Sequence, residues 1–552
     1  MSEIPHTLRP DPAKVIVPRQ HGQILIEPPL SQMALTTSVP PQHFLGITYH
    51  DLRRRARAEL LGAIQRHALA IDAPAPSNTA GDVPWIITGH QVEFYHAGVW
   101  AKVIAADALA RRTHALAIDL LVDHDVVDHP GFDVPAQQPD GTWQRKSITF
   151  RPPTHVAADG LAIPTAAEFE TWDAALARTP AAHTDTLAFI LSALNPSSTQ
   201  NSELRTQNSF TPWMSRARQQ LEAALDLDVH HVPTSGLCDS TAWHFFVLLW
   251  FAYAKTDRGG LPSAYNAALA QYRQAHGIHN THHPIPDLQL GPDLIELPFW
   301  IYRVGSPRER LMVRFQNDGS STIVLGDETV ALPAIPRGED AWKLAGEFQQ
   351  ALTARQLVIR PRALTLTMFV RLFVSDLFIH GIGGALYDQI TDSFLQSQFG
   401  LAPAYACVSA AWLLPLGPHA PAVTPADISD LRHYRHHLRH NPQSGIDPFT
   451  ALKTDYAELI AQRQSLIRQI AASMETNRKA GRLERLALYR QLHAIIDQLH
   501  AKAPQVLAKL DTQLAAAATV LEQDKVLRYR EYYFGLHSMD SLRTLIHKIR
   551  DM

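Results

Sequence analysis

Hydrophobic and polar positions between residues 84 and 125 follow an order that predicts a strand, a helix and a second strand. Residues 85–87 form a short apolar run bounded by a proline and a glycine, as is typical of a buried parallel strand. Residues 99–109 carry apolar side chains at helical spacing, and residues 115–122 form a second apolar run. The segment is therefore predicted to be a βαβ unit.

A similar order returns later in the chain. Residues 357–360 have a strand-like pattern, and the largely apolar segment 372–379 leads into a glycine loop at 380–384. A helical pattern covers residues 385–398, and residues 405–414 have the pattern of a further strand. We expect these elements to join the same sheet as the βαβ unit, with the residues in between forming a long insertion.

The last third of the chain has a different period. Apolar residues recur at alternating spacings of three and four along 452–470, 488–499 and 507–521. Such seams are typical of helices that bury a narrow apolar stripe against a partner helix. The run is interrupted at 477–481 and near Pro504, so a hairpin within one chain and a coiled coil between two chains both fit the pattern.

Together these patterns predict an α/β fold, in which a Rossmann-like parallel sheet core with large insertions is followed by a C-terminal helical coiled-coil domain. Within the insertion, residues 297–304 and 310–315 have the pattern of a hairpin. The expected division of the chain is an N-terminal segment of the core (1–75), the first βαβ half of the core (76–135), an insertion or connecting region (136–350), the second half of the core (351–418), a linker (419–448), the helical coiled coil (449–531) and a C-terminal tail (532–552).

Composition narrows the class of protein. The chain has 552 residues, 46% of them hydrophobic and 19% charged, which is typical of globular proteins with more than one domain. Its formal net charge of −3 gives no general attraction to nucleic acid or to anionic membranes. The longest apolar stretch, 243–254, is too short to span a bilayer, and the N-terminus has no apolar signal core. Since Cys238 and Cys407 alone cannot form a disulfide framework or a zinc site, we expect a cytoplasmic protein that binds neither nucleic acid nor membrane.

Candidate chemistry follows the predicted strands at the points where they end. Because parallel strands place their carboxyl ends at one edge of a sheet, side chains and loops at these points are expected to line a single ligand pocket. Glycines let the backbone approach a ligand, and a helix N-terminus can hold phosphate. The residues concerned are Thr88, Gly89, His90 and Gln91 after the first strand, Asp123, His124 and Asp125 after the second, and Gly381, Gly383 and Gly384 in the later glycine loop.

His124 lies between two carboxylates, which can orient an imidazole or raise its pKa. This arrangement favours a general base. Asp123, His124 and Asp125, together with Asp128 and His129, also fit a metal-dependent phosphoester hydrolase. A helix cap followed by a solvated turn is the structural alternative. Two further histidine clusters are better explained as a loop and a solvated helical face, so no metal is predicted; they are His276, His279, His282 and His283, and His433, His436, His437 and His440.

Four short motifs resemble the BshC family, the cysteine-adding enzymes of bacillithiol synthesis. Residues 88–91 with the following glycine and lysine resemble the family's TGQQ…G…K segment, and residues 122–125 resemble its EDHD. Arg360 with Pro361 matches the end of its LRP motif. Gly383, Gly384 and Tyr387 resemble its VGGP-x-E segment.

The resemblance implies a Rossmann-type core interrupted by connecting segments, a helical coiled coil and a homodimer formed through it. It also implies a ligase that joins the carboxylate of cysteine, or a similar small carboxylate, to the amine of an amino-sugar conjugate such as glucosaminyl malate. A carboxylate is a poor acyl donor, so activation by ATP or another nucleotide is expected. The binding residues implied beside those above are His96, Gly98, Lys102, Arg360 and Tyr387.

The chain also departs from the family pattern. His90 replaces the first glutamine, Val122 replaces an acidic residue, and the proline and glutamate after the glycine pair are missing. Fold is therefore expected to transfer better than substrate. A non-catalytic nucleotide-binding scaffold with a coiled coil stays open beside the ligase and the metal-dependent hydrolase.

Overall fold

The computed structural model describes residues 8–33, 35, 42–196, 208–254, 260–401, 403–417, 422–447, 451, 453–476 and 481–552. The chain is mixed α/β and divides into two compact units. Unit 1 comprises Met1–Ala136, Arg145–Leu414 and Arg530–Met552, and unit 2 comprises Gln137–Gln144 and Pro415–Tyr529. Among the described residues, no helix combines the length and the apolar character needed to cross a membrane.

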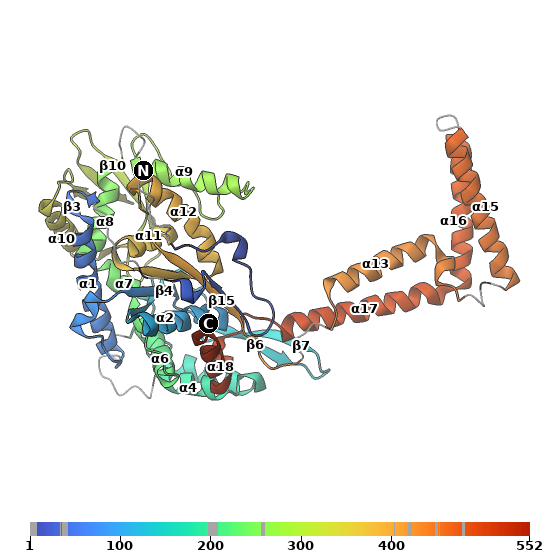
Figure 1. The fold of residues 1–552 in the computed structure, drawn as a ribbon, viewed down its shortest axis with the longest axis horizontal. Coiled ribbons are helices and arrows are strands. Elements are labelled where there is room, and N and C mark those ends of the chain that lie inside the picture. The colour runs from blue at the N-terminus through green and yellow to red at the C-terminus, as the bar shows by residue number, and fades with distance from the viewer. Residues whose placement is uncertain are drawn as a thin grey trace. The chain divides into compact units, whose positions relative to one another are not determined.

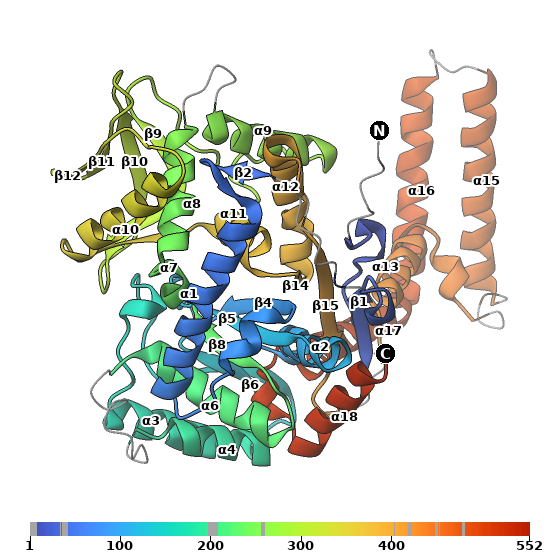
Figure 2. The same cartoon turned by 60° about the vertical axis from the view of Figure 1, so that its left-hand side comes forward.

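Unit 1 is built on a six-stranded sheet with the strand order β1-β15-β14-β4-β5-β8 (Figure 2). Five neighbouring strands are parallel, and β1 pairs antiparallel with β15 at one edge. The strands predicted around residues 85, 116 and 405 are thus confirmed as members of one sheet. The strands are β1 (Gln23–Glu27), β4 (Trp85–Gln91), β5 (Leu116–Val122), β8 (His230–Pro233), β14 (Leu377–His380) and β15 (Tyr405–Ala411).

Two βαβ connections leave the centre of this sheet in opposite directions. Helix α2 (Ala97–Thr113) joins β4 to β5, and α12 (Ile382–Phe399) joins β14 to β15. Because such crossovers are right-handed, the two helices cover opposite faces of the sheet. The adjacent strands β4 and β14 therefore flank the topological switch point, where open α/β sheets bind their ligands beyond the carboxyl ends of the strands.

A second sheet fills much of the predicted insertion. It is antiparallel with the order β12-β11-β10-β9-β13, and the predicted hairpin is confirmed as β9 paired with β10. The strand predicted at 357–360 exists as β13, but it pairs with β9 in this second sheet, so the prediction that it joins the main sheet is wrong. The strands are β9 (Ile295–Arg303), β10 (Glu309–Phe315), β11 (Ser321–Leu325), β12 (Glu328–Leu332) and β13 (Leu357–Pro361).

The apolar run 372–379 is only partly a strand. Its first residues belong to a helical turn, η6 (Val370–Val374), that continues α11 (Ala363–Phe369), and only the end of the run forms β14. The side chains of η6 are all buried, and the only polar residues of the run, Ser375 and Asp376, are adjacent and show neither a helical nor a strand period. This explains why the pattern predicted a longer strand than the structure has.

The remaining helices of unit 1 surround the two sheets. Helix α8 is buried along nearly its whole length and lies in the main apolar core with α1 and α12. Two short ribbons, β2 (His43–Phe44) with β3 (Ile47–Thr48) and β6 (Gly131–Gln137) with β7 (Trp143–Thr149), complete the strands. The helices are α1 (Tyr49–Ala70), α3 (Ala166–Ala177), α4 (Asp185–Leu194), α6 (Phe210–Ala224), α7 (Thr234–Cys238), α8 (Thr241–Ala252), α9 (Gly260–Ala275), α10 (Glu339–Thr353) and α18 (Met539–Arg550).

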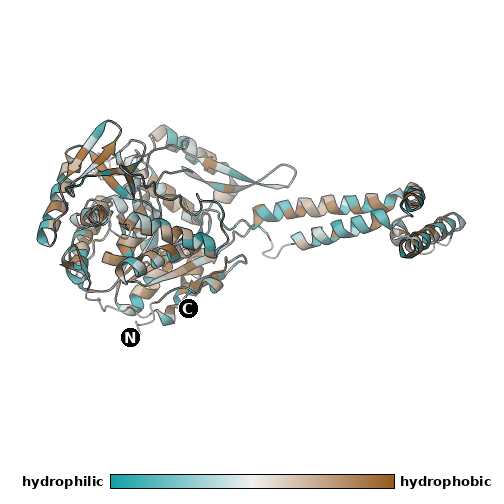
Figure 3. Cartoon of the chain, turned by 90° about the horizontal axis from the view of Figure 1, so that it is seen from above, coloured by the Kyte–Doolittle hydropathy of each residue, from teal (hydrophilic) through white to brown (hydrophobic). Residues whose placement is uncertain are grey.

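Unit 2 consists of two helix pairs (Figure 1). Helix α15 (Thr454–Thr476) packs against α16 (Arg482–Lys502), and α13 (Pro425–His440) packs against α17 (Pro504–Leu527). Along these helices hydrophobic and hydrophilic residues alternate, whereas hydrophobic residues gather inside unit 1 (Figure 3). The segment 419–448, expected as a linker, contains α13, and the segment 532–552, expected as a tail, contains α18 and belongs to unit 1.

The predicted apolar seams of α15 and α16 meet within the chain, although Ile467 beside the first of them stays exposed. Leu459 and Leu466 of α15 are buried in one cluster with Ile495 and Leu499 of α16. The seam residue Leu452 and most of the predicted interruption, residues 477–480, lie outside the described residues.

Candidate functional site

Lys102 lies at the switch point between the end of β4 and the start of α12. Its Nζ donates a hydrogen bond to the carbonyl oxygen of Gly89 at 2.6 Å. Its Cδ lies 3.8 Å from the point that a Cβ on Gly381 would occupy. The Thr88 hydroxyl ties the same strands together by donating to the carbonyl oxygen of Ile379 at 2.9 Å. Burial lowers the pKa of Lys102 to about 8, although Asp119 opposes the shift. The structure therefore brings three of the predicted residues around one buried amine.

Gly89 is required by packing. A Cβ at this position would lie 2.9 Å from both the Cβ and the carbonyl oxygen of Leu120 on β5. The half-buried ring of His90 packs edge-on against Tyr95, with ring centroids 5.2 Å apart. Burial and the neighbouring Lys102 hold the pKa of His90 well below its usual range, so this imidazole is neutral.

His96 and Gly98 serve the start of α2. Nδ1 of His96 accepts a hydrogen bond from the backbone N–H of Gly98 at 3.0 Å, which caps the helix. A Cβ on Gly98 would lie 2.5 Å from the carbonyl oxygen of Ala410, so the residue allows α2 to lie close to β15. The N-terminus of α2, where sequence reasoning expected phosphate, is thus occupied by its own cap.

The N-terminus of α12 is different. Gly381 is its N-cap residue and has no side chain with which to cap, and Gly383 and Gly384 in the first turn are exposed. A helix of eighteen residues whose first N–H groups have no capping side chain favours an anion at this end. Of the two helices that flank the switch point, α12 is therefore the better place for a phosphate.

Asp123 and His124 form a chain of hydrogen bonds with the start of α7. Asp123 accepts from the Thr234 hydroxyl and the Ser235 N–H, each at 2.8 Å, and from the Ser235 hydroxyl at 2.5 Å. Because Thr234 gives its one hydroxyl proton to Asp123, it accepts from Nδ1–H of His124 at 2.8 Å. Nε2 of His124 then keeps its lone pair.

The electrostatics around His124 oppose its protonation. Burial lowers its pKa to about 3, and Arg360 and Arg308 act in the same direction against the attraction of Asp125. Arg308 also donates to the carbonyl oxygen of His124 at 2.9 Å. The imidazole is thus a fixed, neutral acceptor at physiological pH and a weak base.

Asp125 joins the loop after β5 to the loop after β4. Its carboxylate accepts from Arg308 at 2.8 Å and from the Gln91 side-chain amide at 3.4 Å. These bonds connect the two predicted clusters at the carboxyl edge of the sheet. They do not bring the Asp123 side chain to the Lys102 amine by any hydrogen bond of the described residues.

Arg360 reaches the Asp-His-Asp segment from the second sheet. It is 3% exposed and pairs with Asp239 at 2.9 Å and Asp159 at 3.5 Å. Burial and Asp159 raise the pKa of Asp123 to about 6, while Arg360 lowers it. Arg360 therefore balances buried carboxylates. In the part of the chain that the structure describes, no three His, Cys, Asp or Glu residues are placed to hold a metal.

Tyr387 is turned toward α9. Its ring packs edge-on against Tyr272, with centroids 6.5 Å apart, and against His283 at 6.1 Å. It stands where the resembling family has a glutamate, and these contacts give it a packing role on α12.

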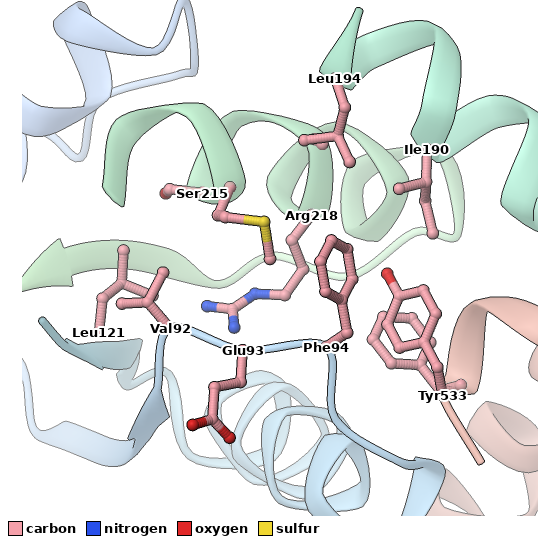
Figure 4. A pocket seen from close by; sticks show the side chains of 12 residues that line it. Val92, Glu93, Phe94, Leu121, Ile190, Leu194, Ser215, Arg218 and Tyr533 are labelled. Atoms are coloured by element: carbon pink, nitrogen blue, oxygen red, sulfur yellow. The ribbon is translucent and has the colours of Figure 1, made fainter. Parts of the chain in front are cut away.

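Two acid–base groups at the carboxyl edge were missed by the sequence reasoning. Glu93 follows β4 and lines a small cavity with Arg218, and its carboxylate points away from that guanidinium (Figure 4). Burial, Asp125 and Asp128 raise its pKa to about 7. His380 ends β14 and bonds to Asp388 at 2.7 Å. The signal available in the sequence was a histidine at a strand end directly before a glycine loop.

A scan against models of known protein families found no match to this chain, and a search of curated proteins found none either.

Proposed function

We propose that this chain is a ligase that forms an amide bond between cysteine, or another small carboxylate, and an amino-sugar conjugate such as glucosaminyl malate. The observation that carries the proposal is the arrangement of Lys102 and the N-terminus of α12 at the switch point. There the amine of Lys102 lies between the loops after β4 and β14, beside the uncapped N-terminus of α12. ATP or another nucleotide is the proposed source of carboxylate activation.

The fold supports the same proposal. We propose that the six-stranded sheet is a Rossmann-like core, because its two βαβ connections diverge from one switch point. We further propose that unit 2 is the coiled coil that the resemblance implies, since two of its seams pack as an antiparallel pair.

The proposed chemistry divides between two groups of residues at the carboxyl edge of the sheet. Lys102 and the free N–H groups of α12 supply positive charge for the phosphate of an activated carboxylate. Glu93 and Asp125, at the carboxyl ends of β4 and β5, supply negative charge for an amino group. His124 is proposed to line the site as a neutral side chain and not to act as the base. Burial and two arginines lower its pKa, and a general base must take up a proton.

The direct test is conjugate formation. We expect purified protein given cysteine and glucosaminyl malate to form a new thiol conjugate, detected by mass spectrometry, only when ATP is present. Nucleotide binding without a conjugate from any amine acceptor would support the scaffold. Phosphoester hydrolysis that depends on added divalent metal and is lost in His124→Ala would support the hydrolase.

A matched pair of lysine variants tests the site. Lys102→Met keeps the buried stem and removes the amine, and we expect it to weaken nucleotide binding by about tenfold or more. Lys343→Met, on the exposed face of α10, is the control and should bind like the wild type. Equal binding by both variants would remove Lys102 from the phosphate site.

We also propose that the protein is a homodimer formed through unit 2. Several large apolar side chains stay exposed after α15 and α16 have paired. Light scattering at micromolar concentration should give twice the chain mass of 61.4 kDa. Placing charges at Leu483 and Leu486 should lower it to one chain, whereas Leu459 and Leu466 lie inside the hairpin and would test its folding. A monomeric wild type would contradict the dimer. The exposed apolar residues are Ile467, Met474, Leu483, Leu486 and Tyr489.

A further inference from the structure

His380 ends β14 at the switch point, and a buried carboxylate holds its imidazole. Nε2 of His380 lies 2.7 Å from Oδ2 of Asp388. Arg371 donates to the same oxygen at 2.6 Å, and the Thr367 hydroxyl donates to Oδ1 at 2.9 Å. Burial opposes the ionisation of Asp388, but Arg371 and His380 outweigh it and hold its pKa well below the usual range. An ionised carboxylate only accepts, so Nε2 carries the hydrogen and Nδ1 keeps its lone pair.

The free nitrogen lies under the exposed first turn of α12. A Cβ on Gly384 would be 2.6 Å from Nδ1 of His380, so only glycine leaves this nitrogen in place. The ring is 6% exposed and is packed between Phe378, with centroids 4.5 Å apart, and Tyr405, at 5.5 Å. Its orientation is therefore fixed, with the lone pair directed at the first turn of α12.

The groups around this imidazole are balanced in charge. Two carboxylates on α12 are offset by two arginines, burial raises the pKa of Cys407 on the neighbouring strand, and burial lowers the pKa of Lys102 on α2 to about 8. The titratable and charged groups that face His380 or its carboxylate come from five parts of the chain. They are Asp388 and Asp392 on α12, Arg371 on η6, Tyr405 and Cys407 on β15, Lys102 on α2, and Arg9 in the segment before β1.

We propose that His380 accepts the proton of the attacking amine in the amide-forming step, with Asp388 as its positioning residue; this rests on the proposed ligase function. The amine nitrogen forms its bond to the activated acyl carbon. The bond from that carbon to the phosphate-bearing oxygen breaks, and the phosphate leaves with the electron pair. The surplus proton on nitrogen moves to Nδ1 of His380, and Asp388 stabilises the imidazolium.

The geometry separates His380 from the other histidine at this edge. His124 is bonded to a hydroxyl and faces two arginines, whereas His380 is bonded to a carboxylate. A carboxylate partner fixes the tautomer and favours the protonated ring, as a general base requires.

The test compares two buried histidines that each bond to a buried carboxylate. In the full-length chain, His380→Gln keeps a donor for Asp388, and we expect kcat for conjugate formation to fall about 100-fold or more while KM changes little. The wild-type rate should fall on the acid side as the base becomes protonated, and this limb should disappear in His380→Gln.

His231→Gln is the matched control, because Nε2 of His231 bonds to Glu222 at 2.8 Å but His231 lies in the edge strand β8, away from β14. It should keep the wild-type kcat and pH profile. Gly384→Ala, which pushes on Nδ1, should reproduce part of the loss seen in His380→Gln. Melting temperatures and circular dichroism of every variant show whether the fold is kept.

The outcomes are distinct. An active wild type whose rate and pH profile survive in a folded His380→Gln overturns the assignment of His380 and leaves the ligase intact. Equal losses in His380→Gln and His231→Gln also overturn it, since removal of any buried histidine would then suffice. A wild type that forms no conjugate overturns the ligase itself, and the assignment of His380 falls with it.

Discussion

Acidification should unfold this protein between about pH 6 and pH 5, because unit 1 buries many neutral histidines. Burial is the largest cause of the lowered pKa in each case. In the unfolded chain the same side chains have a pKa of about 6.5 and become charged. Three of these histidines have a pKa of about 3, namely His67, His124 and His537. His96 and His244 have a pKa of about 4, and His90 and His231 have a pKa well below the usual range.

The sign follows from proton binding. Below pH 6.5 the unfolded state binds more protons at these histidines than the folded state, so their contribution to stability is lost as the pH falls. Five buried carboxyl groups act in the opposite direction, because their raised pKa makes the folded state bind more protons: Asp123 at about 6, Glu93 and Glu222 at about 7, and Asp159 and Asp392, whose pKa burial also raises. The histidines outnumber them, and the net loss at pH 5.5 is roughly 5 kcal/mol, a large part of a typical domain's stability.

Proton uptake on unfolding measures this balance directly. Calorimetric unfolding at pH 6 in buffers of different ionisation enthalpy should show a net uptake of about three protons. The urea midpoint should fall steadily from pH 7.5 to pH 5.5. A midpoint that is flat or rises over this range would show that the carboxyl groups dominate instead.

Arg371→Leu should cost about 3–5 kcal/mol of unfolding free energy. The side chain of Arg371 is fully buried and pairs with Asp388 at 2.6 Å and Asp392 at 2.5 Å, and its guanidinium lies 4.5 Å from the ring centroid of Tyr405. Its removal leaves two buried carboxylates without their main counter-charge. Urea denaturation at pH 7.5 gives the difference, and Arg303→Leu, which breaks the exposed Arg303–Glu328 pair, is the control and should leave the midpoint unchanged.

The difference in unfolding free energy between the wild type and Arg371→Leu should depend on pH. In the wild type the lowered pKa of Asp388 contributes stability that is present above about pH 4 and is lost below it. Without Arg371, burial raises the pKa of the carboxylates, so they take up protons as the pH falls and the gap to the wild type narrows. A gap that widens toward pH 5.5 would mean that Arg371 acts through packing rather than charge.

Much of the sheet follows from local pattern. The unit β4–α2–β5 is bounded by a proline and glycines and has a clear period in each part, and α12 follows a glycine loop in the same way. The pairing partner of each strand was harder to predict. The strand at 357–360 is real, but no local signal says that its partner is β9 rather than a strand of the main sheet.

In the candidate site, too, some contacts could be predicted from local sequence and others could not. Thr88, Gly89 and Gly381 come together because the carboxyl ends of neighbouring parallel strands meet. The hydrogen bonds that fix Asp123 come from residues 111 and 112 positions later in the chain, and the Arg360 contacts come from another sheet, so neither was accessible from spacing. The contact between His380 and Asp388 could have been predicted from the sequence. The two residues are eight positions apart, at the end of a predicted strand and near the start of the helix that follows it.

The last residues of unit 1 also decide when it can form during synthesis. Helix α18 packs on α2, Phe534 stacks on Trp100 with ring centroids 4.9 Å apart, and Arg550 bonds to Asp107 at 2.8 Å. The main part of unit 2 is therefore inserted into unit 1 and is synthesised before α18. Its helices can pair while α2 of the first βαβ unit still lacks the contacts of residues 530–552. A chain cut at residue 446 would expose the apolar face of α2, so a version without unit 2 has to join Leu414 to Arg530 through a short linker. Before residues 530–552 are made, the nascent chain would have paired helices in unit 2 and an uncovered apolar face on α2, and such exposed apolar surface is prone to aggregation and is bound by chaperones.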